Sequence, residues 1–530
     1  MCITHFGNIP CIRSLASHFS PMLKILFTGC LLGMLLVLPE MVMGQAGELD
    51  TSFFDQGRWI YQDSVANVSA ISLVRRSDGG WFVTGERSDG NLMEVIVASL
   101  DLGGELVPGF GDGGVQVLAL PDIPQAQLSA AMGNGTGGLW LAGYTTEFQD
   151  GWVAKIDSNG QFDSSWGAMG ILRLDFGGIE RVESMALTSN QHLLLGGIWG
   201  GMPGLLKLDA FGQPDSTFGD NGYVVRMEAG EGGSVALDSM GNIFLAGTAY
   251  QAGVGGSVWV EKFSEAGVQD SSFGNSGKMS LMSTEFSSRV CISVGVDQGV
   301  LLAADDNYNL GSNTRLWLTK LLPNGQPDPH FGQNGQMLAL EGAEPDDLLI
   351  QPDGYILVSG LLTANSRQDL FVAKYRPDGL LDTTFAKQGY QTSGLAQSPF
   401  QNYTFGRSLA LTDDHRILAA GGTYLNGQGS LLLLRLDNQL DTAQVTAIFD
   451  ARGLSAPYPN PAKDWIRIPI PQGQSVAVQL WSIQGQLLHQ FTSTGEKETT
   501  LQIADFPAGL YYLVVDGGDG KMVRYPILKQ

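Results

Sequence analysis

The chain has 530 residues, 43% of them hydrophobic, so it is long enough for more than one domain and has a globular composition. Asp and Glu total 53 against 30 Lys and Arg, which gives a formal net charge of -23. This balance excludes nucleic acid and anionic membranes as expected partners, because both select a basic surface.

Residues 1–46 are predicted to be a secretory signal region, with Met22 as an alternative start to Met1. Lys24 precedes an apolar run over 25–38, and the small residues Gly44 and Ala46 provide a cleavage region. The alternative, a membrane anchor, is disfavoured because Pro39 interrupts a short apolar core. The mature chain is therefore expected to have no transmembrane segment.

Between residues 47 and 449 one short sequence motif, here called the phrase, recurs in approximate copies. One copy is Asp215-Ser216-Thr217-Phe218-Gly219. The Asp of the phrase is expected to form an Asx-turn, the Gly to take positive φ, and the aromatic residue to fill a gap between units. The aromatic residue recurs at intervals of 52 to 58 residues, which predicts a repeat architecture. Its seven positions are Phe53, Phe110, Trp166, Phe218, Phe273, Phe331 and Phe385.

Each unit shows the period-two alternation of β-strands, with four strands per unit. In the sixth unit these strands are expected around 336–340, 347–351, 355–360 and 370–375. The last strand carries a basic residue in six units, and each base is expected to pair near the Asp of the following phrase. The six bases are Lys155, Lys207, Lys262, Lys320, Lys374 and Arg435. Seven such units predict an all-β, seven-bladed β-propeller, with an open β-solenoid as the alternative.

The repeated phrase, together with the turn Pro352-Asp353-Gly354, resembles the delta-60 repeat family of predicted β-propellers. The resemblance covers residues 47–449. It implies the propeller fold and carries no settled enzymatic activity.

After a short linker at 450–453, residues 454–530 contain short alternating strands that predict a small β-sandwich. This tail resembles the C-terminal sorting domain of the type IX (Por) secretion system. The resemblance implies the type IX machinery as a partner and passage through the periplasm to the outer surface or the medium. Removal or anchoring of the tail stays open, and an ordinary carbohydrate-binding appendage is the alternative. The matching motif residues are Pro459, Asn460, Pro461, Gly485, Pro507, Gly509, Leu510 and Tyr511.

The sequence contains no zinc-binding spacing of His or Cys, no Gly-x-Ser-x-Gly elbow and no Walker phosphate loop, so no catalytic residue is assigned. Oxygen-bearing side chains alternate at Asp305, Asn307 and Asn309, a pattern that suits Ca²⁺. An ordinary polar loop is the alternative, and no other cofactor is expected.

Four aromatic residues follow the third strand of their units and are expected to surround one exposed face, where aromatic rings hold sugars or peptides. The alternative is that they pack between loops. The predicted function is a secreted or cell-surface, non-catalytic binding or scaffold protein for a glycan or surface protein. A secreted carboxylate-dependent hydrolase or lyase acting on polysaccharide is the alternative. The four aromatics are Tyr144, Trp199, Tyr250 and Tyr424.

Overall fold

The structure is a computed structural model that describes most of the chain after residue 45. The described ranges are 46–90, 92–123, 125–146, 149–226, 230–251, 255–282, 290–306, 314–397, 402–438, 458, 462–469, 475–482, 487–494, 498–504, 506–507, 509–516 and 522–529. The predicted signal region, except for residue 46, and the predicted linker lie outside the described residues.

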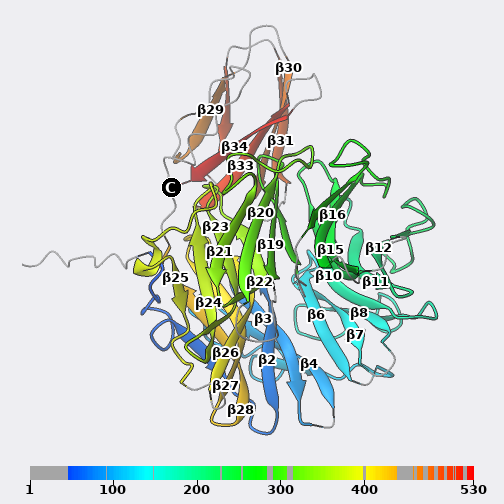
Figure 1. Cartoon of the computed structure of the whole chain (residues 1–530), viewed down its shortest axis with the longest axis vertical. Coiled ribbons are helices and arrows are strands. Elements are labelled where there is room, and N and C mark those ends of the chain that lie inside the picture. The colour runs from blue at the N-terminus through cyan, green and yellow to red at the C-terminus, as the bar shows by residue number, and fades with distance from the viewer. Residues whose placement is uncertain are drawn as a thin grey trace, which may run out of the picture. The chain divides into compact units, whose positions relative to one another are not determined.

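Between residues 58 and 436 the described chain forms seven four-stranded antiparallel sheets (Figure 1). Sheet 1 contains β2 (Asn67–Arg75), β3 (Trp81–Ser88), β4 (Met93–Leu100) and β5 (Val115–Leu118). Sheet 2 contains β6 (Ala126–Gly133), β7 (Leu139–Thr145), β8 (Gly151–Ile156) and β9 (Ile171–Leu174). Sheet 3 contains β10 (Arg181–Leu187), β11 (Leu193–Trp199), β12 (Met202–Leu208) and β13 (Tyr223–Val225).

The remaining sheets follow the same order. Sheet 4 contains β14 (Glu231–Leu237), β15 (Ile243–Gln251), β16 (Gly255–Phe263) and β17 (Lys278–Met282). Sheet 5 contains β18 (Val290–Val294), β19 (Val300–Asp306), β20 (Arg315–Leu321) and β21 (Gln336–Glu341). Sheet 6 contains β22 (Ala343–Ile350), β23 (Ile356–Ala364), β24 (Arg367–Tyr375) and β25 (Tyr390–Thr392). Sheet 7 contains β26 (Tyr403–Leu411), β27 (Ile417–Leu425), β28 (Gln428–Leu436) and, as its fourth strand, β1 (Arg58–Tyr61).

The sequence repeat and the sheets are out of phase by one strand. The residues expected to open the sixth unit, 336–340, form the outer strand β21 of the preceding sheet. The reason is the phrase itself: Asp328 N–H donates to the Lys320 carbonyl at 2.9 Å, and Lys320 N–H donates to the Gly335 carbonyl at 2.9 Å. Each phrase therefore turns the chain back onto the sheet that it has just left.

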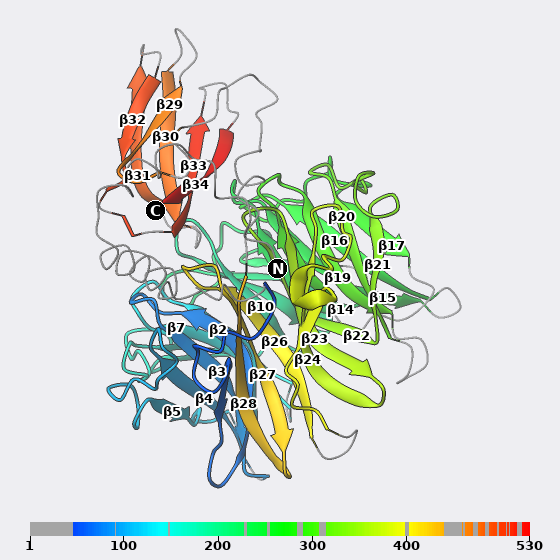
Figure 2. The same cartoon turned by 90° about the vertical axis from the view of Figure 1, so that its left-hand side faces the viewer.

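The sheets close into a ring. The first strand of each sheet contacts the first strand of the next, and β26 of the last sheet contacts β2 of the first. The first phrase then leads into β1, which pairs with β28 in the register Arg58 to Leu434. Figure 2 shows the early, blue strands beside the yellow strands β26 to β28. The ring is thus closed by pairing a strand from its beginning with a strand from its end.

The core lies between consecutive sheets. One hydrophobic cluster joins Phe82 and Val97 of sheet 1 to Leu141 and Trp152 of sheet 2. The second strand of each sheet is buried on both faces, as its near-continuous apolar sequence predicts; all seven residues of β11 are buried. Burial on both faces makes these strands the least accessible part of the ring.

The phrase has the predicted geometry. Asp215 Oδ1 accepts hydrogen bonds from Thr217 N–H at 3.0 Å and Thr217 Oγ1 at 2.6 Å, which is an Asx-turn. Phe218 is fully buried against Gly267 of the next sheet, where φ is 78° and a Cβ would lie only 2.9 Å from the Phe218 ring. The aromatic residue therefore fixes one sheet against the next, and all seven aromatic positions are buried.

The base of the third strand pairs with the Asp of the following phrase, which confirms the prediction at five positions. The nitrogen-to-oxygen distances are 2.9 Å for Lys155 and Asp163, 3.4 Å for Lys207 and Asp215, 3.1 Å for Lys262 and Asp270, 3.6 Å for Lys320 and Asp328, and 2.6 Å for Arg435 and Asp50. Lys374 Nζ also donates to Asn438 at 3.1 Å.

The tail forms two antiparallel sheets. β29 (Trp465–Pro469) pairs with β32 (Glu498–Gln502), and the second sheet has the order β31 (Leu487–Thr494), β30 (Ser475–Ser482), β33 (Gly509–Asp516) and β34 (Met522–Lys529). Buried residues of both sheets, including Ile466, Leu480 and Leu513, form one hydrophobic cluster.

Candidate functional site

The two ends of the ring differ. The phrases connect the third and fourth strands at one end, here called the phrase end. The opposite end, here called the variable end, carries the connections from second to third strand and from each sheet to the next. Because neighbouring strands are antiparallel, the ends of β7, β11, β15, β19 and β27 all lie at the variable end. The predicted ligand residues of the ring that the structure describes belong to this end.

The four predicted aromatics do not share one register. Counted from the small residue that ends the repeated strand motif, Tyr144 lies at the first following position, Trp199 at the second, and Tyr250 and Tyr424 at the third. Successive side chains of a strand point to opposite faces, so Trp199 is directed into the core and is only 4% exposed. The prediction that Trp199 is exposed is wrong for this reason.

Two of the other aromatics are half-buried. Tyr144 lies beneath the Arg181 guanidinium, 5.8 Å from its ring centroid. Tyr424 stacks on Tyr403 with ring centroids 5.4 Å apart. The side chain of Tyr250 lies outside the described part of the structure. Tyr144 thus contacts a charged residue of a first strand.

Asp305 does not begin a loop. It is buried within β19, opposite Leu316, at the strand position that Glu86 and Tyr144 occupy in sheets 1 and 2. The next residue, Asp306, binds Arg315 at 2.6 Å and accepts the Trp317 indole N–H at 2.7 Å. Asn307 and Asn309 lie outside the described residues. Asp305 thus belongs to a strand and not to the expected loop, and calcium binding by these residues stays a prediction.

The first strands of five sheets carry a β-bulge at the same repeat position. A bulge adds an unpaired residue and re-aims its side chain. Because the first strands surround the axis, these five residues gather there although they differ in type. They are Ile71, Ser129, Glu183, Asp346 and Arg407.

Arg407 is the centre of a group of charged residues near the axis. Its Nη1 lies 2.6 Å from Asp346 Oδ1 of the neighbouring sheet. On its other side is Glu86 of sheet 1, whose Oε1 accepts the Leu128 N–H at 3.0 Å. Burial raises the pKa of Glu86, although the Leu128 hydrogen bond and the Arg407 charge oppose the shift. Burial also lowers the pKa of Arg407, against the attraction of Glu86.

The group continues around the axis. Arg407 also interacts electrostatically with Tyr144, and Arg181 places its Nη2 2.9 Å from Glu231 Oε2 of sheet 4. We call these residues the axial charge network; six sheets contribute one member each. The members are Glu86, Tyr144, Arg181, Glu231, Asp346 and Arg407.

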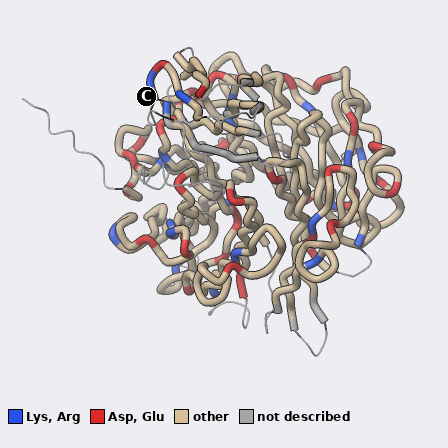
Figure 3. Tube along the Cα trace, turned by 90° about the horizontal axis from the view of Figure 1, so that it is seen from above, with Lys and Arg blue, Asp and Glu red and all other residues tan. Residues whose placement is uncertain are grey.

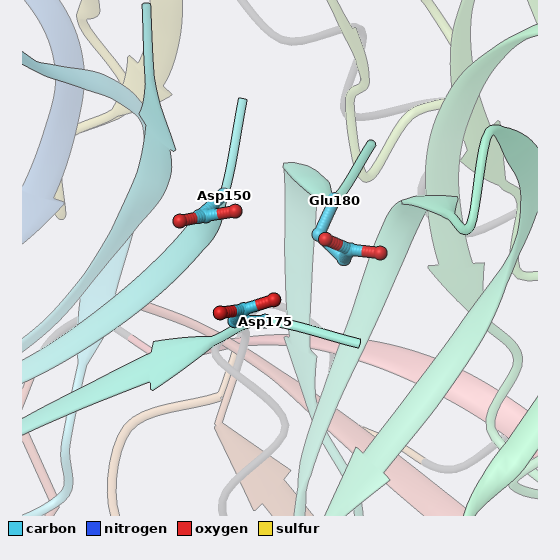
Figure 4. A group of neighbouring side chains, drawn as sticks. All are labelled: Asp150, Asp175 and Glu180. Atoms are coloured by element: carbon cyan, nitrogen blue, oxygen red, sulfur yellow. The ribbon is translucent and has the colours of Figure 1, made fainter. Parts of the chain in front are cut away.

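A second cluster at the variable end contains three carboxylates, Asp150, Asp175 and Glu180, here called the acidic cluster (Figure 4). Asp150 precedes β8, Asp175 follows β9 and Glu180 precedes β10, so two consecutive sheets contribute. One oxygen from each residue lies within 4.8 Å of the others. Arg173 Nε donates to Asp150 Oδ2 at 3.0 Å. Three carboxylates with one guanidinium provide an oxygen-rich, negatively charged site.

The described motif residues of the tail have structural roles. Tyr511 is buried in the hydrophobic cluster, and its hydroxyl donates to the Pro507 carbonyl at 2.7 Å. Gly509 begins β33, and Leu510 follows it in that strand. Pro459, Asn460, Pro461 and Gly485 lie outside the described residues.

Sequence reasoning missed the axial charge network and the acidic cluster. Asp346 and Arg407 occupy bulge positions at which the other repeats have different residue types. An alignment of the repeats that searches for charged residues at such variable positions would have identified both. The acidic cluster leaves no such mark, because its members lie in loops of different length on two sheets.

The fold is that of an all-β protein of the β-propeller type, followed by a separate C-terminal β domain. Two segments match family models: residues 456–529 match the secretion system C-terminal sorting domain, and residues 351–385 match a β-propeller domain of unknown function, DUF5122. Both resemblances are thereby confirmed for these segments. The sorting domain indicates export by type IX secretion to the cell surface or the extracellular space.

Solved structures with similar folds have low sequence identity to the chain. A protein of unknown function from Dyadobacter fermentans is 10% identical, with a TM-score of 0.39, and the match covers 72% of this chain and 100% of that one. The polysaccharide lyase Uly1 is 9% identical, with a TM-score of 0.43 and coverage of 74% and 100%. The β-propeller domain of the Trilobed protease from Pyrococcus furiosus is 9% identical, with a TM-score of 0.36 and coverage of 71% and 94%. A comparison with curated proteins gave no match.

Within the described residues, no helix has the length and apolar character needed to span a membrane. Figure 3 shows acidic and basic positions interspersed along the trace.

Proposed function

We propose that the chain is a surface-exposed or secreted binding protein, without catalytic activity of its own, that presents a seven-bladed β-propeller over residues 47–449. Its ligand is a glycan or a protein of the same cell surface. The seven sheets, with contacts between successive first strands and between the last and the first, support the blade count. The shared cluster of the two tail sheets supports a β-sandwich over residues 454–530.

The observation that carries this proposal is the asymmetry between the two ends of the ring. At the phrase end, the sheets repeat the same Asx-turn, the same buried aromatic residue and the same ion pair. One-off charged and aromatic residues collect toward the variable end instead. A motif present in every blade is a structural element, whereas residues unique to one blade are available for recognition. The variable end is therefore the proposed binding face.

The loop that contains the acidic cluster also exposes an aromatic ring. Phe176 is 48% exposed and contacts Tyr223 edge to face, with ring centroids 5.2 Å apart. An exposed ring held by a second ring, next to carboxylates, is a surface on which a sugar or an aromatic side chain packs. Phe176 is thus the proposed aromatic contact.

The proposal is tested by screening residues 46–530 against arrays of glycans and peptides and repeating each hit with Phe176→Ser. Phe211→Ser is the matched control, since Phe211 is a more exposed phenylalanine in a turn at the phrase end. We expect Phe176→Ser to lower affinity at least tenfold and Phe211→Ser to have no effect. Equal affinities in the two variants would place the binding face elsewhere, and turnover of a bound ligand would overturn the non-catalytic proposal.

A second candidate, a hydrolase or lyase acting on polysaccharide, is favoured by one observation. Burial raises the pKa of Glu86, although the Arg407 charge opposes the shift, and a raised pKa is the direction that a carboxyl acting as general acid requires. Glu86→Gln would abolish such turnover while leaving ligand binding intact. Unchanged turnover in Glu86→Gln would eliminate this candidate.

A further inference from the structure

We propose that the acidic cluster binds a single Ca²⁺ ion that joins sheets 2 and 3 at the variable end. This inference is independent of the proposed ligand-binding function. The ligands are one carboxylate oxygen each from Asp150, Asp175 and Glu180. Asp175 is exposed, so backbone oxygens or water complete the coordination from the solvent side.

Glu180 is the residue that requires a cation. Its side chain is fully buried, and its Oε2 has no hydrogen-bond partner among the described residues. Its other oxygen, Oε1, accepts only a long hydrogen bond of 3.3 Å from Gly200 N–H within the described part. In Figure 4 one Glu180 oxygen is directed toward Asp150 and Asp175. A buried carboxylate without a partner is strongly unfavourable, so the cluster is complete only with a positive ion.

The charge of the cluster matches a divalent ion. Three carboxylates carry three negative charges, and Arg173 supplies one positive charge through Asp150 Oδ2, with Asp175 Oδ2 at 3.9 Å. The remaining charge is about two negative units. Arg173 donates to Asp150 Oδ2 through both Nε and Nη2, so the guanidinium is held by this carboxylate.

The ligand chemistry favours Ca²⁺. All donors are oxygens, which excludes ions that select nitrogen or sulfur. Calcium accepts irregular coordination at 2.3–2.6 Å, so two ligand oxygens on opposite sides of the ion lie up to about 5 Å apart. The three carboxylate oxygens of the cluster, which lie within 4.8 Å of one another, fit around such an ion. Mg²⁺ demands a near-ideal octahedron with distances of about 2.1 Å, which loops from two sheets with one shared arginine do not provide.

The test is titration of EDTA-treated residues 46–530 with CaCl₂, followed by calorimetry and by thermal unfolding. We expect binding of one ion per chain and a rise in Tm of roughly 3 °C at a hundred times Kd. Asp175→Asn should lower the affinity at least tenfold. Glu180→Gln should abolish the Tm response and melt above the calcium-free parent, because it removes the buried charge.

Asp378→Asn is the matched control. Asp378 is exposed and pairs with an arginine two residues earlier, as Asp175 does with Arg173, but it lies at the phrase end. This variant should respond to calcium like the parent. The proposal is overturned if the parent shows neither heat nor a Tm shift, if Asp175→Asn and Glu180→Gln both keep the response, or if MgCl₂ replaces CaCl₂ at equal concentration.

Discussion

Arg435 Nε lies 2.6 Å from Asp50 Oδ2, although 385 residues separate the two in the chain. The pair reproduces the contact that Lys155 makes with Asp163 inside sheet 2. Nearby, Gly47 N–H donates to the Asp437 carbonyl at 2.7 Å. The last sheet therefore obtains its fourth strand, its phrase and its ion pair from the beginning of the ring.

The closing ion pair should matter more than its counterparts within a sheet. Asp50→Asn removes a buried charge partner of Arg435 and Arg416, and it weakens the attachment of the N-terminal strand. We expect a loss of about 2 kcal/mol in the free energy of unfolding, measured by urea denaturation. The region around β1 should also become susceptible to limited proteolysis.

Asp270→Asn is the control for this prediction, because Asp270 has the same Asx-turn and pairs with Lys262 within one sheet. It should cost about 1 kcal/mol and leave β1 protected. Proteolysis of β1 at equal rates in both variants would contradict a special role of the closing pair.

The phrase makes the protein sensitive to acid. Hydrogen bonds from Ser165 and Lys155 lower the pKa of Asp163 from 3.8 to about 2. A carboxyl whose pKa is depressed in the folded state stabilises the fold above its unfolded pKa and loses this contribution as the pH falls toward the folded value. Asp163→Asn should therefore cost about 1 kcal/mol at pH 7 and almost nothing at pH 2, as measured by urea denaturation.

Asp347 should show the opposite dependence. Burial raises its pKa to about 6, although Leu409 and Leu348 N–H groups donate to it at 2.6 and 2.8 Å. The folded state holds this proton between about pH 4 and pH 6, so the contribution of Asp347 to stability falls as the pH rises through that window. Relative to the parent, Asp347→Asn should gain about 2 kcal/mol between pH 4 and pH 7. A constant difference across this window would contradict the prediction.

The axial charge network should be a mutually dependent unit. Arg407→Met leaves Asp346 and Glu86 without their cation, so we expect a loss of about 3 kcal/mol in urea denaturation. Adding Asp346→Asn and Glu86→Gln should restore most of this loss, because the uncompensated charges are then gone. Arg376→Met, which removes an exposed arginine paired with Asp378, is the control and should change stability by less than about 0.5 kcal/mol. Additive effects of the network substitutions would contradict the prediction.

The sequence predicted the repeated parts of the fold well and its one-off parts poorly. A turn such as Asp215 to Gly219 is determined by local chemistry, so its Asx-turn and buried aromatic residue follow from the residues alone. The period-two alternation of apolar residues does not show which sheet a strand joins. The pattern therefore predicts β21 as the first strand of the following unit, whereas it is the fourth strand of the preceding sheet.

The candidate sites depend on contacts between sheets. Arg407 and Asp346 lie 61 residues apart and meet only because two bulges face the same axis. Trp199 is a second example of what local sequence does not determine. A shift of one residue along the strand is enough to move an aromatic side chain from the surface into the core. Neither relationship is contained in local sequence chemistry.

The origin of β1 has a consequence for the order in which the protein folds. In a chain exported from its N-terminus, Arg58 to Tyr61 emerge before the other strands of the ring, but their partner strand, Gln428 to Leu436, emerges after all of them. The intervening sheets are built from consecutive strands and need only short loops to close. The final step is a long-range closure that buries the open edge of β28, and until then that edge is free to pair with another chain. The sorting domain follows this strand in the chain, so the ring becomes complete only when the segment that directs secretion is about to emerge.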